Sequence, residues 1–552
     1  MKNKRNLLML FTAIMAGILM TGCSESNEIT EIIVPEAGGD KDSQEQLSDE
    51  VSKMLEKLPG VSDVTIDTVV DITSLKQDKV YFFYFNQPID HKNPALGTFK
   101  QRASLKYVSQ DAPVVLYTNG YSMGDSAHQV RDVDLRSHLN ANMLSVEHRY
   151  FNKSLPEASD NLDFTYLWSD QAAADLHAIV DMMKRNVFSQ NKWISTGVSK
   201  DGITTAMYAY YSDLNGWDDI DLYVPFGAPF LTATPTCSDD IRMGQYLYNN
   251  CGAGYDADSE MGIAYARLRK MPIAIANNKV LREACIKEFY QKYPKDYVEV
   301  INTFGRSEEE VTCGLLFNML MLNFYKFSGV PFSSWAKLVP DVDKAIDIAT
   351  TQKEMDDRDE AIEQVAEFAF MSSKDVEDSL KAMLLKDLQE DYTDPYSYQQ
   401  TRAAYTDEEL FQLRNTDYDM PYYVQAAREF GNVAIDFSML EGTAISTDKA
   451  YSVADIFENH TNMQKYASQW DGGRLMSDFR SWVKTQSKYK MLFVYCTDDP
   501  WTGGAIDDST NPVVTKIVSK GGCHSDEFLN DKLYTTEASQ KIIAAIKSYI
   551  GL

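Results

Sequence analysis

One stretch of this sequence, residues 193–208, restricts the fold more than any other. A short apolar run over residues 193–198 contains Gly197, Ser199 follows it, and residues 203–208 have the pattern of a helix start. A sharp turn between a strand and a helix holds a serine hydroxyl out at the top of a sheet, and it needs very small neighbours. The stretch therefore predicts a nucleophile at Ser199. A serine that only caps a turn or helix is the alternative interpretation.

The turn departs from the usual G-x-S-x-G pattern at one position. Asp201 stands two residues after Ser199, where the pattern has glycine, and Gly202 comes one place later. A side chain at this crowded position predicts an altered turn and puts full catalytic competence in doubt.

The histidines offer a base for this serine. The chain has 7 histidines, and only His460 and His524 follow Ser199. His524 follows the apolar run 513–518, and Asp499 follows a similar run that ends at residue 496. Serine, acid and histidine come in this order in α/β-hydrolases. The order and the strand-tip positions predict a triad of Ser199, Asp499 and His524. The alternative is a turn cap at Asp499 and an ordinary loop histidine at His524.

Apolar runs alternate with helical patterns in the first half of the chain. Strands are expected over residues 113–118, 143–147 and 221–226, and an amphipathic helix over residues 171–183. This alternation predicts a mostly parallel sheet covered by helices. Aromatic and alternating residues between 81 and 108 predict a β-hairpin layer at the sheet edge. The expected fold class is α/β, with an α/β-hydrolase core.

The pattern changes in the middle of the chain. Residues 231–483 have few strand-like runs and many helical ones, which predicts a large helical cap inserted between nucleophile and acid. Residues 50–230 and 484–552 form the expected α/β-hydrolase domain.

Backbone N–H groups near the strand tips are the expected oxyanion donors. In α/β-hydrolases one comes from the residue after the nucleophile, here Lys200, and one from the loop after an earlier strand. That loop contains Gly120 and Tyr121. Gly120 as a plain turn glycine is the alternative.

Residues 1–23 have the pattern of a bacterial lipoprotein signal peptide. A basic start is followed by an apolar stretch, residues 7–20, that is too short for a comfortable transmembrane helix. The small residues before Cys23 resemble a lipobox, in which the cysteine is lipidated. Residues 24–49 are polar and acidic and predict a flexible tether. We expect an exported protein, periplasmic or at the cell surface, that is anchored to a membrane through Cys23. A plain secretory signal is the alternative.

Charge and cysteine content limit the partners. The formal net charge of −28 argues against nucleic acid and anionic membrane surfaces as partners. Beyond Cys23 the chain has six cysteines, an even number that permits disulfides in an exported protein and leaves fifteen pairings open. A bridge between Cys496 and Cys523 would join the acid loop to the base loop. No spacing suggests a zinc site, and no cofactor is expected.

Several motifs occur together along the chain. They are Gln-Pro-Ile-Asp-His at 87–91, Gly-Thr-Phe-Lys-Gln-Arg at 97–102, Glu-His-Arg-Tyr-Phe at 147–151, Gly-Val-Ser-Lys at 197–200, Asp-Pro-Trp at 499–501, Gly-Cys-His at 522–524 and Glu-Phe-Gly at 429–431. The set resembles serine peptidase family 37, of the prolyl tripeptidyl aminopeptidase type, and the related lysosomal Pro-Xaa carboxypeptidase and dipeptidyl peptidase group. The resemblance covers roughly residues 80–230 and 484–530.

The resemblance implies a serine exopeptidase that releases short peptides, tripeptides or dipeptides, from free N-termini, often after proline. It carries the roles of nucleophile, acid and base to Ser199, Asp499 and His524. An exopeptidase also needs a group that pairs with the substrate ammonium, and Glu429 is the candidate. An exposed helix charge is the alternative for Glu429. Trp501 lines an apolar proline pocket or belongs to the core.

Two rival functions remain at this stage. One is a lipoprotein esterase or lipase, because a fold does not fix its substrate. The other is a surface lipoprotein with a degenerate turn that binds peptides or glycans, which Asp201 favours. The oligomeric state is left open.

Overall fold

A computed structural model of the chain describes residues 49–70, 77–127, 129–130, 133–156, 163–292, 308–329, 332–372, 375–376, 378–379, 420–435, 437–443, 451–452, 463–522, 524 and 536–551. The expected signal peptide and nearly all of the expected tether lie outside these residues. Over the described ranges, no helix is long and apolar enough to cross a membrane.

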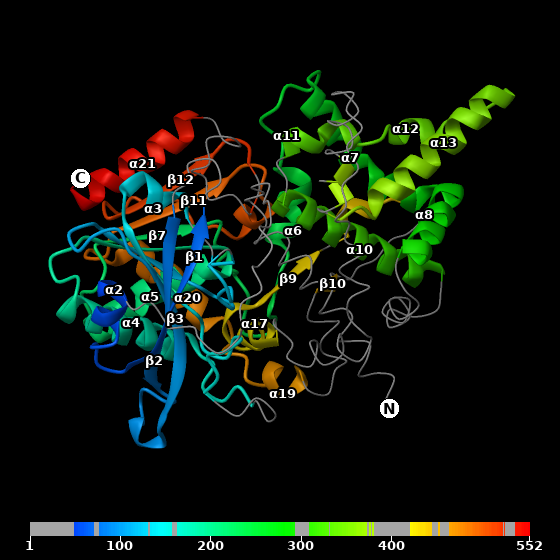
Figure 1. The fold of residues 1–552 in the computed structure, drawn as a ribbon. Coiled ribbons are helices and arrows are strands. Elements are labelled where there is room, and N and C mark those ends of the chain that lie inside the picture. Colours follow the sequence, from blue (N-terminus) through cyan, green and yellow to red (C-terminus); the bar gives the residue numbers. More distant parts are fainter. Residues whose placement is uncertain are drawn as a thin grey trace, which may run out of the picture.

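A nine-stranded sheet forms the centre of one lobe, on the left in Figure 1. The strand order is β1-β2-β3-β5-β4-β6-β7-β11-β12. Strands β1 to β3 are antiparallel, and the pairs from β5 to β12 are parallel. The strands are β1 Val61–Val70, β2 Gln77–Pro88, β3 Thr98–Lys106, β4 Val114–Thr118, β5 Asn142–Val146, β6 Trp193–Val198, β7 Leu222–Phe226, β11 Met491–Cys496 and β12 Val514–Ser519. This confirms the predicted α/β-hydrolase core with its antiparallel edge; β1 was not predicted.

Helices cover both faces of the sheet. Val114 and Leu116 of β4 pack on one side, while Val115 and Tyr117 pack on the other. Both faces are therefore buried, which explains the uninterrupted apolar runs in the sequence. One face packs against α4 Ser169–Asn186, α5 Lys200–Asn215 and α20 Arg474–Thr485, and the other against α3 Asp134–Leu139 and α21 Thr536–Ile550. Helix α2 Glu50–Leu55 precedes β1.

A mainly helical lobe, on the right in Figure 1, follows β7 in the chain. Its helices are α6 Arg242–Asn249, α7 Glu260–Asn277, α8 Lys279–Lys292, α10 Glu308–Gly329, α11 Phe332–Trp335, α12 Val342–Ile346 and α13 Gln352–Ala369. Later in the chain come α17 Met420–Gln425, the π-helix η3 Ala426–Phe430 and α19 Met463–Ala467; α17 and α19 are drawn in the lower middle of Figure 1, beside the sheet lobe. A small sheet of β8 Asp239–Asp240, β9 Asn432–Ile435 and β10 Tyr451–Ser452 accompanies them and was not predicted. Single-turn 3-10 helices are η1 Pro94–Leu96, η2 Ala336–Leu338, η4 Ser438–Leu440 and η5 Pro500–Gly504.

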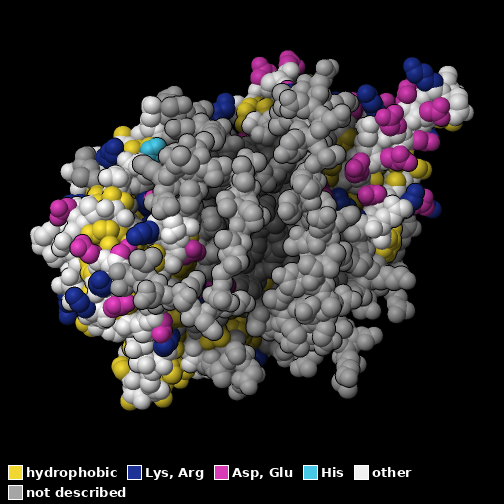
Figure 2. Space-filling model, viewed as in Figure 1, with side chains coloured by type: hydrophobic (Ala, Val, Ile, Leu, Met, Phe, Trp, Pro, Cys, Tyr) yellow, Lys and Arg dark blue, Asp and Glu magenta, His cyan; other side chains and the backbone are white. Residues whose placement is uncertain are grey.

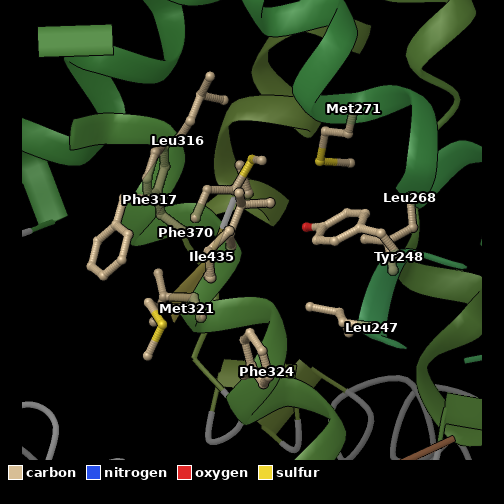
Figure 3. Packing of buried hydrophobic residues seen from close by; sticks show 14 of the residues in the cluster. Leu247, Tyr248, Leu268, Met271, Leu316, Phe317, Met321, Phe324, Phe370 and Ile435 are labelled. Carbon is tan, nitrogen blue, oxygen red and sulfur yellow. The ribbon is translucent and has the colours of Figure 1, made fainter. Parts of the chain in front are cut away.

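The helical lobe has a core of its own. Figure 3 shows Leu247 and Tyr248 of α6 with Leu268 and Met271 of α7 on one side, facing side chains of α10 such as Phe324. The phenol oxygen of Tyr248 accepts a hydrogen bond from Asn323, which satisfies the one polar atom of that side chain in an apolar setting. The cap is thus a packed unit and not a loose set of loops.

One helix departs from the predicted division of the chain. Helix α20 lies within the predicted cap range, but its residues Leu475, Met476 and Phe479 share a core cluster with the sheet.

On the outer surface, acidic side chains gather over α13 (Figure 2), in keeping with the net charge of −28.

The predicted disulfide framework is only partly covered by the described residues. Cys237, Cys251 and Cys285 are free thiols, and the last two are buried. Cys523, the predicted partner of Cys496, lies outside the described residues.

Candidate active site

Ser199 occupies a strained turn between β6 and α5. Its φ of 59° and ψ of −124° lie where non-glycine residues are uncommon. Two backbone hydrogen bonds hold the turn: Ser199 N–H donates to Phe226 O of β7 at 2.9 Å, and Ile203 N–H donates to Ser199 O at 2.9 Å. The side chain is 7% exposed. This is the strand–turn–helix geometry expected of a nucleophile elbow.

The small residues of the turn are there for lack of space. A Cβ at Gly197 would lie 2.5 Å from the carbonyl carbon of Asp201, and a Cβ at Gly202 would lie 2.9 Å from Cβ of Ala228. Neither distance is tolerable without a backbone shift. Helix α5 therefore lies very close to β6 at Gly197 and very close to the segment after β7 at Gly202.

Asp201 does not distort this turn. Its carboxylate turns toward β4, where Oδ2 accepts the hydroxyl of Tyr117 at 2.6 Å and Oδ1 accepts the N–H of Gly120 at 2.5 Å. Its carbonyl oxygen accepts the hydroxyl of Thr118 at 2.9 Å. The predicted damage to the turn geometry is therefore wrong: the aspartate is accommodated by the neighbouring strand.

Asp499 and His524 form a buried pair. Asp499 follows β11 at the start of η5, and His524 follows β12; they are 0% and 3% exposed. His524 Nδ1 lies 2.9 Å from Asp499 Oδ2, and the second oxygen, Oδ1, accepts the N–H of Trp501 at 2.9 Å. An Nδ1–H that donates to the carboxylate leaves Nε2 as an acceptor. Within the described part of the chain, this buried Nε2 has no hydrogen-bond partner.

Strand β7 connects the serine turn to this pair. Phe226 O binds Ser199 N–H, and the next residue, Gly227, has a φ of 52°. A Cβ at Gly227 would lie 3.3 Å from both Asp499 Oδ2 and His524 Cε1. The structure therefore brings all three predicted residues to one edge of the sheet, where β6, β7, β11 and β12 are consecutive.

The predicted oxyanion donors differ in whether their N–H groups already donate to another group. Lys200 is the first residue of α5, so its N–H has no partner within the helix. Tyr121 lies in the loop after β4, and its carbonyl oxygen accepts His148 N–H at 3.3 Å. The N–H of Gly120 already donates to Asp201 and is not available to an oxyanion, so the prediction for Gly120 is wrong.

The loop that contains Tyr121 is held by buried charged groups. Glu147 accepts the N–H of Met123 at 2.9 Å and the hydroxyl of Ser154 at 2.7 Å. Burial raises the pKa of Glu147 to about 7, against these hydrogen bonds. Arg149, two residues on, makes two 2.7 Å contacts with Asp175. The Glu-His-Arg motif at 147–149 therefore has a structural role next to the site.

Trp501 belongs to the core and also contacts the base. Its ring is stacked on His524 at 4.2 Å between centroids and meets Phe324 of α10 edge-on at 5.4 Å. The backbone N–H of His524 donates to Phe327 O, also of α10, at 3.0 Å. Sequence reasoning missed these two cap residues, because no local pattern relates α10 to a histidine some 200 residues later.

Glu429 is buried, so the alternative of an exposed helix charge is wrong. It lies in η3 and is 5% exposed. Its Oε2 accepts both the N–H and the hydroxyl of Ser169, each at 2.9 Å, at the start of α4. Its Oε1 accepts no hydrogen bond from the described residues. Burial raises the pKa of Glu429 to about 8, although the Ser169 contacts lower it.

The segment that carries Glu429 reaches the oxyanion loop. The ring of Tyr422, in α17, lies 5.9 Å from the ring of Tyr121. Burial lowers the pKa of Lys200 to about 7, while the charges of Asp201 and Glu429 act in the opposite direction. Glu429 is therefore close enough to influence the residue next to the nucleophile. No cluster of metal-ligating side chains occurs in the described ranges.

Comparisons with known proteins find peptidases among the proteins that this chain resembles. The family model of PS-10 peptidase S37 matches residues 51–233, which hold β1 to β7 and Ser199. A prolyl tri/tetrapeptidyl aminopeptidase of Streptomyces mobaraensis is 24% identical over 458 residues, 79% of this chain and 74% of that protein. The human lysosomal Pro-X carboxypeptidase is 27% identical over 204 residues, 31% of this chain and 41% of that protein.

Solved structures give weaker similarities. A carboxyl esterase from Bacillus coagulans covers 85% of this chain with 10% identity and a TM-score of 0.29. That score is too low to carry an argument about substrate. The resemblance stated from the motifs is confirmed by the family model and the curated relatives.

Proposed function

We propose that this chain, a serine hydrolase of the peptidase class that resembles serine peptidase family 37, is an exopeptidase that releases short peptides from free N-termini. Cleavage after proline, with release of tripeptides or dipeptides, is the preferred form of the proposal. The observation that carries it is the combination of a strained Ser199 with a buried Asp499–His524 pair at the same sheet edge.

The proposed chemistry is acyl transfer. Ser199 Oγ attacks the scissile carbonyl carbon while His524 Nε2 takes the hydroxyl proton, and Asp499 stabilises the imidazolium through Nδ1–H. The N–H groups of Lys200 and Tyr121 donate to the oxyanion. The proton then passes from His524 to the leaving amine, and water releases the acyl group by the same steps in reverse order.

Glu429 is proposed to bind the substrate ammonium. Its Oε2 is occupied by Ser169, while Oε1 has no partner among the described residues. A buried carboxylate binds an ammonium more strongly than an exposed one, because less water competes. An esterase needs no such group, so Glu429 favours the exopeptidase over the esterase alternative. The intact turn removes the argument for a degenerate binding protein.

Trp501 is proposed to border the pocket for the residue before the scissile bond. It is 9% exposed and stacks on His524, so any remaining surface of the ring lies beside the reacting bond. A flat apolar surface suits a proline ring.

The compartment is part of the proposal. The sequence of residues 1–23 supports an exported lipoprotein attached to a membrane through Cys23. Metabolic labelling with a radioactive fatty acid tests it: we expect label in the wild type and none in Cys23→Ser. Label in both proteins would refute the anchor.

The direct test of activity is cleavage of a peptide mixture, read by mass spectrometry, with protein that lacks residues 1–23. Each peptide is supplied with a free and with an acetylated N-terminus, and Ser199→Ala is the blank. We expect release of di- or tripeptides from free N-termini only. Equal cleavage of acetylated peptides would refute amine recognition, and cleavage of short acyl esters alone would support the esterase.

Glu429→Gln tests the proposed binding of the substrate ammonium by Glu429. Loss of a charge-assisted contact worth about 1.5–3 kcal/mol should raise KM for free-amine peptides about 10- to 100-fold. Glu441→Gln changes an exposed glutamate 12 residues later in the chain; it is the matched control and should change nothing. An unchanged KM in Glu429→Gln would refute the role.

Binding of the substrate ammonium by Glu429 also predicts that KM depends on pH. Below its pKa of about 8 the Glu429 carboxyl is protonated in the free enzyme. An ammonium favours the carboxylate, so KM should fall as the pH rises toward 8. Above about pH 8 the substrate amine loses its proton and KM should rise again. In Glu429→Gln the rise in KM on the acid side should be absent.

A further inference from the structure

The side chains of the two residues after the nucleophile hold one residue of the neighbouring loop from both sides. The ammonium of Lys200 donates a hydrogen bond to the carbonyl oxygen of Gly120. The carboxylate of Asp201 accepts the N–H of the same glycine, with 2.5 Å between N and Oδ1. We call these three residues the Gly120 clasp. The turn at Ser199 does not itself require the clasp, because backbone groups form the turn and side chains form the clasp.

The Lys200 contact fixes a peptide group that carries a proposed oxyanion donor. The C=O of Gly120 and the N–H of Tyr121 belong to the same planar peptide, and no cis peptide occurs among the described residues. In a trans peptide the C=O and N–H point in opposite directions. With the Gly120 oxygen held toward Lys200, the Tyr121 N–H is directed away from the ammonium.

The clasp is tightly packed. A Cβ at Gly120 would lie 2.9 Å from both Asp201 Oδ1 and Lys200 Cγ, so only glycine fits between them. Lys200 is 1% exposed, and its Nζ lies 5.3 Å from the ring centroid of Tyr121. Asp201 is 8% exposed and is fixed in turn by the hydroxyl of Tyr117. Each partner of Gly120 thus has a defined position before any substrate binds.

We infer that the side chains of Lys200 and Asp201 are positioning residues, which align the N–H of Tyr121 with that of Lys200 to form the oxyanion site. The inference rests on the assignment of Ser199 as nucleophile in the proposed function. Asp201, the departure from the usual glycine, then contributes to catalysis and does not impair it. A donor held before the reaction costs no reorganisation when the oxyanion forms.

An alkyl fluorophosphonate tests the clasp without knowledge of the peptide substrate. The Ser199 Oγ–P bond forms, the P–F bond breaks, fluoride leaves, and the hydroxyl proton passes to His524. The phosphoryl oxygen then occupies the oxyanion site. The measurement is the second-order labelling rate constant, and Ser199→Ala should take up no probe.

Lys200→Met and Asp201→Ala should each lower this rate constant about 10- to 100-fold, since one oxyanion donor is misaligned. The double variant should be about as slow as the slower single one, because both side chains act on Gly120. Asp201→Asn keeps an acceptor for the Gly120 N–H and should recover most of the rate. Lys106→Met removes another buried lysine, on β3, and is the matched control for which no change is expected.

Rate constants within about twofold of wild type for folded Lys200→Met and Asp201→Ala would overturn the inference. If Lys200→Met does not fold, the Asp201 variants decide: an Asn variant as slow as the Ala variant, or an Ala variant as fast as wild type, overturns it. A wild-type protein that takes up the probe but cuts no peptide would refute the exopeptidase and leave the clasp intact.

Discussion

The nucleophile and the base of the candidate triad are held in different ways. Ser199 is fixed by its own stretch of chain, the end of β6, the turn with φ 59° and the start of α5, with one hydrogen bond to the neighbouring β7. His524 is fixed by groups from separate parts of the chain: the Asp499 carboxylate, the Trp501 ring and the Phe327 carbonyl of the cap helix α10.

This difference predicts which substitutions should disturb the surroundings of Ser199, here called the serine end, and which should disturb those of His524, the histidine end. The serine end depends on local sterics, so it should be sensitive to added atoms in the turn and insensitive to the cap. The histidine end depends on contacts between lobes, so it should respond to changes in the cap core. Three substitutions, taken from the largest expected effect to the smallest, test the comparison.

Asp499→Asn should have the largest effect. An asparagine leaves the shape of the pair but favours the wrong tautomer of His524, and kcat should fall about 10⁴-fold. Steady-state kinetics on a cleaved peptide measure it, with thermal unfolding as the check on folding. A fall of less than about tenfold would show that other contacts suffice to orient the base.

Gly197→Ala should displace the turn at Ser199 and leave the surroundings of His524 unchanged. Its Cβ would lie 2.5 Å from the Asp201 carbonyl carbon, so the turn must shift. A displacement near 1 Å costs about 100-fold in rate, which peptide cleavage and fluorophosphonate labelling should both report. Gly254→Ala is the matched control, since its Cβ would meet only Lys520 Cε, at 3.7 Å. Normal activity in Gly197→Ala would mean that the turn is not held by local sterics.

Trp501→Leu should disturb the position of His524 and have a smaller effect on kcat. Loss of a ring stack worth about 0.5–1.5 kcal/mol should lower kcat about tenfold and leave KM within about threefold, while Trp501→Phe should retain most of the rate. Trp193→Leu removes another buried tryptophan, at the start of β6, and should lower stability without changing kcat. If both tryptophan variants change kcat equally, stacking on His524 is not the cause.

Much of the sheet lobe could be predicted from the sequence. The apolar runs predicted six parallel strands, β4, β5, β6, β7, β11 and β12, to within a residue, because strands buried on both faces must be apolar throughout. Strand β1 was missed, since its run Val-Ser-Asp-Val-Thr-Ile-Asp-Thr-Val-Val mixes polar and apolar residues at a sheet edge. The small β8–β9–β10 sheet was missed because strands of two to four residues are too short to show a period.

Predictions that depended on side-chain partners fared less well. Asp201 was expected to disturb the turn, yet its carboxylate accepts hydrogen bonds from Tyr117 and Gly120. Gly120 was expected to donate to an oxyanion, yet its N–H is already used. Both errors have one cause: the partners lie on β4 and in the loop after it, about 80 residues before the turn, and only the parallel pairing of β4 with β6 brings them together.

The sequence by itself determined the order of serine, acid and histidine, the small residues around Ser199 and the alternating pattern of the core, because these follow from local sterics and from burial along single elements. The tertiary structure alone decided which groups hold them: the Gly120 clasp, the Ser169 contact of Glu429 and the contact of α10 with His524. Such contacts join residues that are far apart in the chain, and their energy depends on geometry that appears only when the chain has folded.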